Sequence, residues 1–124
     1  MTDLTRAVQA FLASLGVAAY PAGLVPPGAA LPLLTWDMRV ARFGERGTIT
    51  ATAWFDGPDR HILRAAFLDT ALEAVPEGGL RLALPGGFVL LERGSDFLAP
   101  VTDPAHPHLA GGTVRLTLRR FGAT

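Results

Sequence analysis

The chain has 124 residues, of which 49% are hydrophobic and 18% are charged, and its formal net charge is zero. This length fits a single domain, residues 1–124, that can build a core without disulfides or a metal ion. The lack of cysteine excludes a disulfide framework, a thiolate metal site and a redox nucleophile. The lack of a polybasic run argues against sequence-independent nucleic-acid binding, and so neutral a surface gives weak protection against self-association.

The N-terminal segment predicts an amphipathic helix followed by a short strand. Thr2 or Asp3 can cap the helix, and Gly16 is a natural stop. The apolar face, at helical spacing, consists of Leu4, Val8, Phe11, Leu12 and Leu15. Residues Val17 to Tyr20 then predict a short edge strand.

An uncharged stretch between Ala7 and Trp36 has the length of a membrane span. Glycines and prolines interrupt it, however, and the chain does not start like a signal peptide. We therefore expect a soluble, cytoplasmic protein with no membrane partner, in which Pro21 to Ala30 is a surface linker.

Two alternating segments predict a hairpin. Leu33 to Phe43 and Thr48 to Phe55 read as strands, joined by a turn over residues 44–47. Trp36 and Trp54 fall in opposite phases of the alternation. Trp54 is therefore expected to face outward or toward a neighbouring molecule.

A second helix is predicted after this hairpin. Asp59 is its expected N-cap, and Pro76 with Gly78 and Gly79 ends it. Its predicted buried face consists of Ile62, Leu63, Ala66, Phe67, Leu72 and Val75.

The last third of the chain predicts a tight hairpin, a long loop and a final strand. Leu80 to Leu84 and Phe88 to Arg93 pair around the turn at residues 85–87. Gly94 to Gly112 reads as an irregular loop, and Thr113 to Phe121 reads as the closing strand. A small domain that spends so much chain on one loop usually uses it for contact.

This order of elements predicts an α+β fold. We expect an antiparallel β-sheet with two amphipathic helices packed on one face, in two layers.

Catalytic and metal-binding interpretations of the loop are weak. Asp103, His106 and His108 could form a metal site, but prolines separate them and no fourth ligand is evident. Ser95, His106 and Asp103 could form a triad, but Ser95 lacks the strand-turn-helix that exposes a nucleophilic serine. We therefore predict solvated loop side chains, no catalytic residue, no metal and no cofactor.

Three segments of the chain carry a resemblance to a known family. The first is the linker Val25 to Gly28 leading into Leu31 to Trp36, and the second is the strand Thr48 to Phe55 followed closely by a helix. The third is Gly86 to Ser95, followed by a loop with Asp103 and a terminal strand. Together they resemble the small tail-terminator proteins, also called tail-completion or minor capsid proteins, of long-tailed phages and prophages, and the resemblance spans nearly the whole chain.

The resemblance implies a non-enzymatic virion protein at the junction of tail and neck, assembled in the host cytoplasm. Its partners would be further copies of itself in a six-membered ring, the tail-tube protein and a head-completion or connector protein. The ring would cap the finished tube, stop its polymerisation and join it to the head. The alternatives are a head-completion or neck connector protein and a small-ligand-binding α+β domain.

DNA would pass through such a ring without being gripped, so we expect no specific nucleic-acid binding and an acidic or neutral lumen. Glu45, Asp96 and Asp103 are the candidates to line it. The predicted assembly-interface residues are Arg39, Arg42, Glu45, Arg46, Trp54, Asp96, Phe97, Asp103, Arg119 and Arg120.

Overall fold

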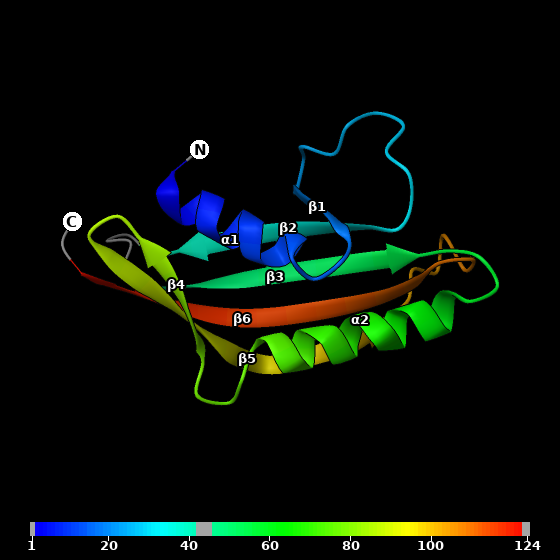
Figure 1. The fold of residues 1–124 in the computed structure, drawn as a ribbon. Helices are drawn as coiled ribbons and strands as arrows, with labels where there is room; N and C mark the ends of the chain where they lie inside the picture. The colour runs from blue at the N-terminus through cyan, green and yellow to red at the C-terminus, as the bar shows by residue number, and fades with distance from the viewer. Residues whose placement is uncertain (1, 42–45, 123–124) are drawn as a thin grey trace.

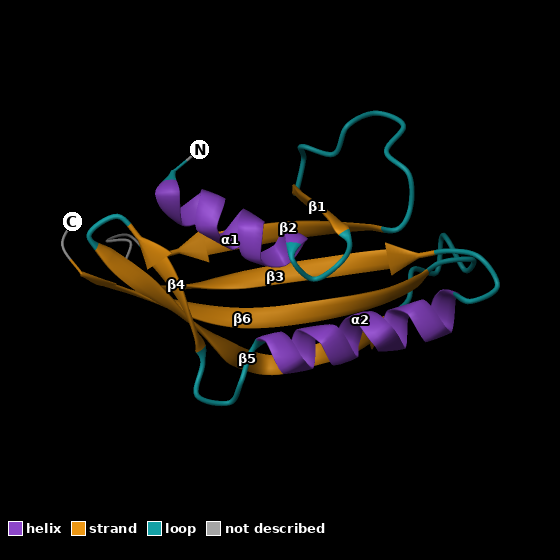
Figure 2. Ribbon diagram, in the orientation of Figure 1, coloured by secondary structure: helices purple, strands orange, loops and turns teal. Residues whose placement is uncertain are grey.

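A computed structural model describes residues 2–41 and 46–122, which form two helices and six strands in a two-layer α+β arrangement (Figures 1 and 2). The helices are α1 (Asp3–Ala13) and α2 (Arg60–Ala74). The strands are β1 (Ala18–Pro21), β2 (Leu33–Val40), β3 (Arg46–Phe55), β4 (Leu80–Leu84), β5 (Gly87–Val101) and β6 (Ala110–Gly122). They form one sheet in the order β1-β2-β3-β6-β5-β4.

The sheet is mixed, so the expectation of a purely antiparallel sheet is wrong. β1 pairs in parallel with β2, whereas every other neighbouring pair of described strands is antiparallel. A parallel pair needs a long connection to return the chain to the same end of the sheet. The Pro/Gly linker between Pro21 and Leu33 supplies it, and Figure 1 shows it as a wide excursion above the sheet.

Helix α1 has the predicted cap and the predicted buried face. The Thr2 hydroxyl accepts a hydrogen bond from the Thr5 backbone N–H at 3.1 Å. All five predicted apolar residues are buried, and the half-buried Gln9 binds two further elements. Its amide nitrogen donates to the Ala19 carbonyl at 2.8 Å, and its amide oxygen accepts from the Trp36 indole N–H at 2.6 Å. α1, β1 and β2 are therefore tied together by one polar side chain.

Helix α2 has a much narrower buried face than predicted. Phe67 and Ala71 are buried on the helix, with Val75 buried just beyond it, and these residues are four apart. The prediction that Ile62, Leu63, Ala66 and Leu72 are buried is wrong. All four are exposed, Ile62 by 69% and Leu63 and Leu72 by 44% each. A helix that lies on a sheet buries only the stripe that touches it, and residues on either side of that stripe stay in solvent.

The predicted loop from Gly94 to Gly112 is mostly strand, which corrects that interpretation. β5 continues to Val101 and β6 begins at Ala110, so the connection covers only residues 102–109. The pairing shifts register between Arg93 and Leu98, where Asp96 has a φ of 52°, and resumes with Leu98 opposite Val114. A bulge absorbs irregular residues without ending a strand, which is why the glycine at position 94 does not terminate the sheet.

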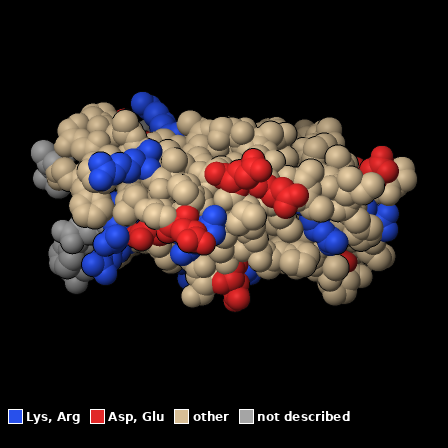
Figure 3. Space-filling view, turned by 60° about the horizontal axis from the view of Figure 1, so that its bottom comes forward, with Lys and Arg blue, Asp and Glu red and all other residues tan. Residues whose placement is uncertain are grey.

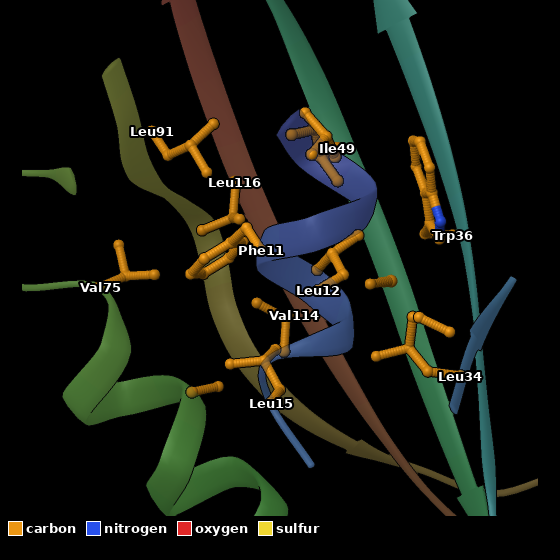
Figure 4. Packing of buried hydrophobic residues seen from close by; sticks show 14 of the residues in the cluster. Phe11, Leu12, Leu15, Leu34, Trp36, Ile49, Val75, Leu91, Val114 and Leu116 are labelled. Carbon is orange, nitrogen blue, oxygen red and sulfur yellow. The ribbon is translucent and has the colours of Figure 1, made fainter. Parts of the chain in front are cut away.

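Both helices pack on the same face of the sheet and contribute to one hydrophobic cluster (Figure 4). Phe11, Leu12 and Leu15 of the α1 region meet Val114 and Leu116 of β6, and Val75 approaches from the end of α2. α1 also lies against both edge strands, β1 and β4, so the sheet curls around this helix. Within the described residues, neither helix is long and apolar enough to cross a membrane.

Candidate assembly surfaces

The second face of the sheet points away from both helices and is rich in threonine. Because side chains alternate along a strand, the residues that alternate with the buried Ile49, Ala51 and Ala53 point to this outer face. Across the strands these outward residues are Thr35, Asp37 and Arg39 of β2, Thr48, Thr50 and Thr52 of β3, and Thr113, Arg115 and Thr117 of β6. The Thr52 and Thr113 hydroxyls are hydrogen bonded at 3.0 Å, and a broad depression of about 510 Å³ lies over β2 and β3.

Trp54 lies on this outer face, as the alternation predicted. Its ring covers Gly111 of β6: a Cβ atom at that glycine would lie 2.7 Å from Trp54 Cζ3 and 2.6 Å from Val101 Cγ2. The glycine therefore leaves the space in which the indole rests. Trp36 points the other way, is 3% exposed and belongs to the core.

The arginines predicted near the hairpin tip lie in different surroundings. Arg39 is exposed on β2, with its guanidinium 3.9 Å from the Asp37 carboxylate. An exposed pair at that distance contributes little to stability. Arg42 and Glu45 lie outside the described residues.

Arg46, Arg119 and Arg120 form a basic cluster at one end of the sheet. Arg46 starts β3 directly opposite Arg119 of β6, so the register brings together two residues predicted from distant parts of the sequence. Arg119 is paired with Glu92 at 2.9 Å. Together with Phe121, which is 41% exposed, the three arginines line a hollow of about 150 Å³.

Aromatic rings extend this end of the outer face. Phe121 stacks on Phe88 of β5 with 5.1 Å between ring centroids. Arg81 and Arg119 lie over these two rings, at 4.6 Å from Phe88 and 5.7 Å from Phe121. Such contacts are attractive because the faces of aromatic rings carry partial negative charge.

Asp96 and Phe97 occupy the bulge of β5. Asp96 is exposed, and its backbone carbonyl accepts from Arg115 at 3.2 Å. Phe97 is half-buried, packs against the core and lies 5.0 Å beneath the guanidinium of Arg93. Arg93 in turn donates to the Val75 and Leu72 carbonyls at the end of α2. Phe97 thus supports a structural contact of α2.

Asp103 and His106 form a local turn in the connection between β5 and β6. The Asp103 carboxylate accepts from His106 Nδ1 at 2.9 Å and from the Ala105 backbone N–H at 3.0 Å. The hydrogen bond from His106, followed by that from Ala105, lowers the pKa of Asp103 from its ordinary value of 3.8. The His108 ring lies 5.9 Å from that of His106, and within residues 2–41 and 46–122 no three acidic, histidine or cysteine side chains are placed to hold a metal ion.

One exposed surface on α2 was missed at the sequence level. Asp69, Leu72 and Glu73 are exposed on the part of the helix that faces away from the sheet. The signal was present but misread: an apolar stripe containing Ile62, Leu63 and Leu72 is wider than one sheet contact can bury.

A scan of protein-family models and a search of curated proteins find no match for this chain. The resemblance to tail terminators therefore stays a prediction, and the functional argument below is made from the surfaces just described.

Proposed function

We propose that this protein is a tail terminator, a structural subunit that assembles into a ring on the end of a completed phage-type tail tube. The ring stops polymerisation of the tube and presents a surface to the head connector. In this role the protein binds other proteins and carries out no reaction.

The observation that carries the proposal is the residue content of the outer face. Trp54, the stacked pair Phe88 and Phe121, and the arginines Arg46 and Arg119 all lie on one side of the sheet. Tryptophan, phenylalanine and arginine are the side chains enriched where proteins meet. A face with this content supports a role in assembly.

Ring formation requires two different surfaces on each subunit, because a ring closes from repeated head-to-tail contacts. The outer face of the sheet and the outer side of the helix layer are two such surfaces. The formal net charge of zero also suits a ring through which DNA passes, because tight binding to phosphates would need an excess of paired cations.

Deletion of the gene in a particle-forming strain tests the proposal. The expected result in electron micrographs is tails of uncontrolled length that are not joined to heads, with normal tails restored by the wild-type gene supplied in trans. A second arm mixes the purified protein with its tube protein and measures the assembly by native mass spectrometry, where a ring bound to tube ends is expected.

Two outcomes would contradict the proposal. Tails of normal length joined to heads would show that the protein has no role at this junction. Tails of normal length that stay separate from heads would assign the protein to the neck as a connector.

A further inference from the structure

We propose that two surfaces of this chain are the two halves of one head-to-tail interface between copies. The basic patch consists of Arg46, Arg119 and Phe121 on the outer face of the sheet. The acidic patch consists of Asp69, Leu72 and Glu73 on α2, with Glu77 in the turn that follows. This inference rests on the self-assembly in the proposed function and names the surfaces that meet.

The two patches are opposite in charge. In the basic patch Arg119 is paired with Glu92 at 2.9 Å, and Arg46 is exposed at the start of β3 directly opposite it. Arg120 lies outside this patch, because it pairs opposite the buried Val89 on the inner face of the sheet. In the acidic patch Asp69 and Glu73 are exposed, one helical turn apart on the same side of α2. Arg93 lies at the margin of this patch, but its guanidinium is held by the Leu72 and Val75 carbonyls. Figure 3 shows acidic side chains near the middle of one face, and basic side chains at both ends of it and beside the acidic ones.

Each patch also carries an exposed apolar side chain. Leu72 is 44% exposed beside Glu73 on α2, and Phe121 is 41% exposed near the arginines of the basic patch. Interfaces commonly combine an apolar anchor with charges around it.

The patches cannot meet within one molecule because they lie on opposite faces of the two layers. Arg46 and Arg119 share the outer face of the sheet with Thr117 and Glu92. α2 covers the inner face through Phe67 and Ala71, and its acidic patch points away from the sheet. A contact between different surfaces of identical subunits is heterologous, and it produces a closed ring or a filament.

Charge reversal on each side of the contact tests this inference. Glu73→Arg alone and Arg46→Glu alone each place like charges in the interface, so each should weaken self-association about ten-fold or more. The double variant Glu73→Arg/Arg46→Glu restores opposite charges in every contact and should assemble again. An equimolar mixture of the two single variants should also assemble. Native mass spectrometry and light scattering measure the species, and the association of the wild type should fall as salt rises.

Three controls keep the test interpretable. Asp56→Arg and Arg6→Glu are matched reversals at exposed positions outside both patches, and they should assemble like the wild type. Leu72→Ala removes only the exposed apolar side chain of the acidic patch. It should therefore lose assembly while keeping the circular dichroism spectrum and the urea midpoint of the monomer. If either single reversal lowers the urea midpoint of the monomer, its weaker assembly reflects a less stable fold. The Leu72→Ala variant then decides whether the acidic patch belongs to the interface.

Several outcomes would overturn the inference. Wild-type protein that stays monomeric at every concentration would do so, as would single variants that assemble like the wild type. In the second case the self-assembly stands and only the interface is wrong. If the variants behave as expected but gene deletion leaves tails normal, the interface stands and the proposed function falls.

Discussion

Replacing Arg93 with methionine should destabilise the protein by about 2 kcal/mol, because this one side chain closes the C-terminal end of α2. The helix has no basic residue in its last turn, and its C-cap, Val75, has extended backbone angles. Arg93 reaches across from β5 and donates through Nε to the Val75 carbonyl at 2.8 Å and through Nη2 to the Leu72 carbonyl at 3.1 Å. It thus places a positive charge where the helix dipole is negative.

The magnitude follows from these contacts. The part-buried hydrogen bond to Val75 should contribute about 1 kcal/mol and the exposed one to Leu72 about 0.5 kcal/mol. The guanidinium lies 5.0 Å from the centre of the Phe97 ring, and a contact of this kind at a half-exposed site contributes about 0.5 kcal/mol. Methionine keeps much of the aliphatic packing of Arg93, so the measured loss of stability reports the polar contacts. Lysine keeps the charge but lacks the planar two-pronged donor, and Arg93→Lys should lose about half as much.

Urea unfolding at a protein concentration where the wild type is monomeric measures the effect. The midpoint should fall with an unchanged slope, and amide exchange should increase in the last turn of α2. Arg6→Met is the matched control, since Arg6 is exposed on α1 and 3.9 Å from Asp3, and it should change stability by less than about 0.5 kcal/mol. An Arg93→Met protein as stable as the Arg6→Met protein would refute the argument that Arg93 caps the helix.

Three further predictions concern other parts of the fold. Gln9→Met removes both side-chain hydrogen bonds that join α1 to Ala19 and Trp36, and it should cost about 2 kcal/mol in urea unfolding; a loss below about 0.5 kcal/mol would contradict a structural role for the amide. Gly111→Ala forces a methyl group against Trp54 and Val101 and should cost about 1–3 kcal/mol with a changed tryptophan emission, whereas Gly78→Ala, where the added atom meets open space, should be nearly neutral. Asp103 has a lowered folded pKa, so its stabilising contribution is complete above the unfolded value of 3.8 and is lost as the pH falls through the folded value. Carboxyl NMR titration should show that His106→Ala raises the pKa of Asp103 and that His108→Ala does not; equal effects of the two variants would refute the assignment.

Local signals in the sequence predicted most of the elements. The Thr2 cap, the buried face of α1 and the tight turn between β4 and β5 all depend on residues close together in the chain. Their sequence patterns can therefore be recognised before the tertiary structure is known. The parallel pairing of β1 with β2 was not predictable in this way. It depends on where the linker returns the chain, and the linker's composition indicates only that it lies on the surface.

The extent of β5 shows a second limit. Gly94, Pro100 and Gly112 are residues that usually interrupt strands, and they led to the prediction of a long loop. In the folded chain a bulge takes up the irregular residues, and Pro100 pairs opposite Gly112 in the ladder. Tertiary pairing with β6 therefore overrides the local preference.

The candidate surfaces were only half predictable for a related reason. Arg46 and Arg119 could be proposed separately as exposed strand ends, but only the register of β3 with β6 places them opposite each other. On α2 an exposed residue was predicted to be buried, because Leu72 fits the helical apolar pattern of a core face. Hydrophobic periodicity indicates how much of a helix could avoid water, and the sheet of one chain need not cover all of it. An apolar stripe wider than the sheet contact, flanked by Asp69 and Glu73, is therefore the sequence signal to examine first when a helix is expected to lie at an interface between subunits.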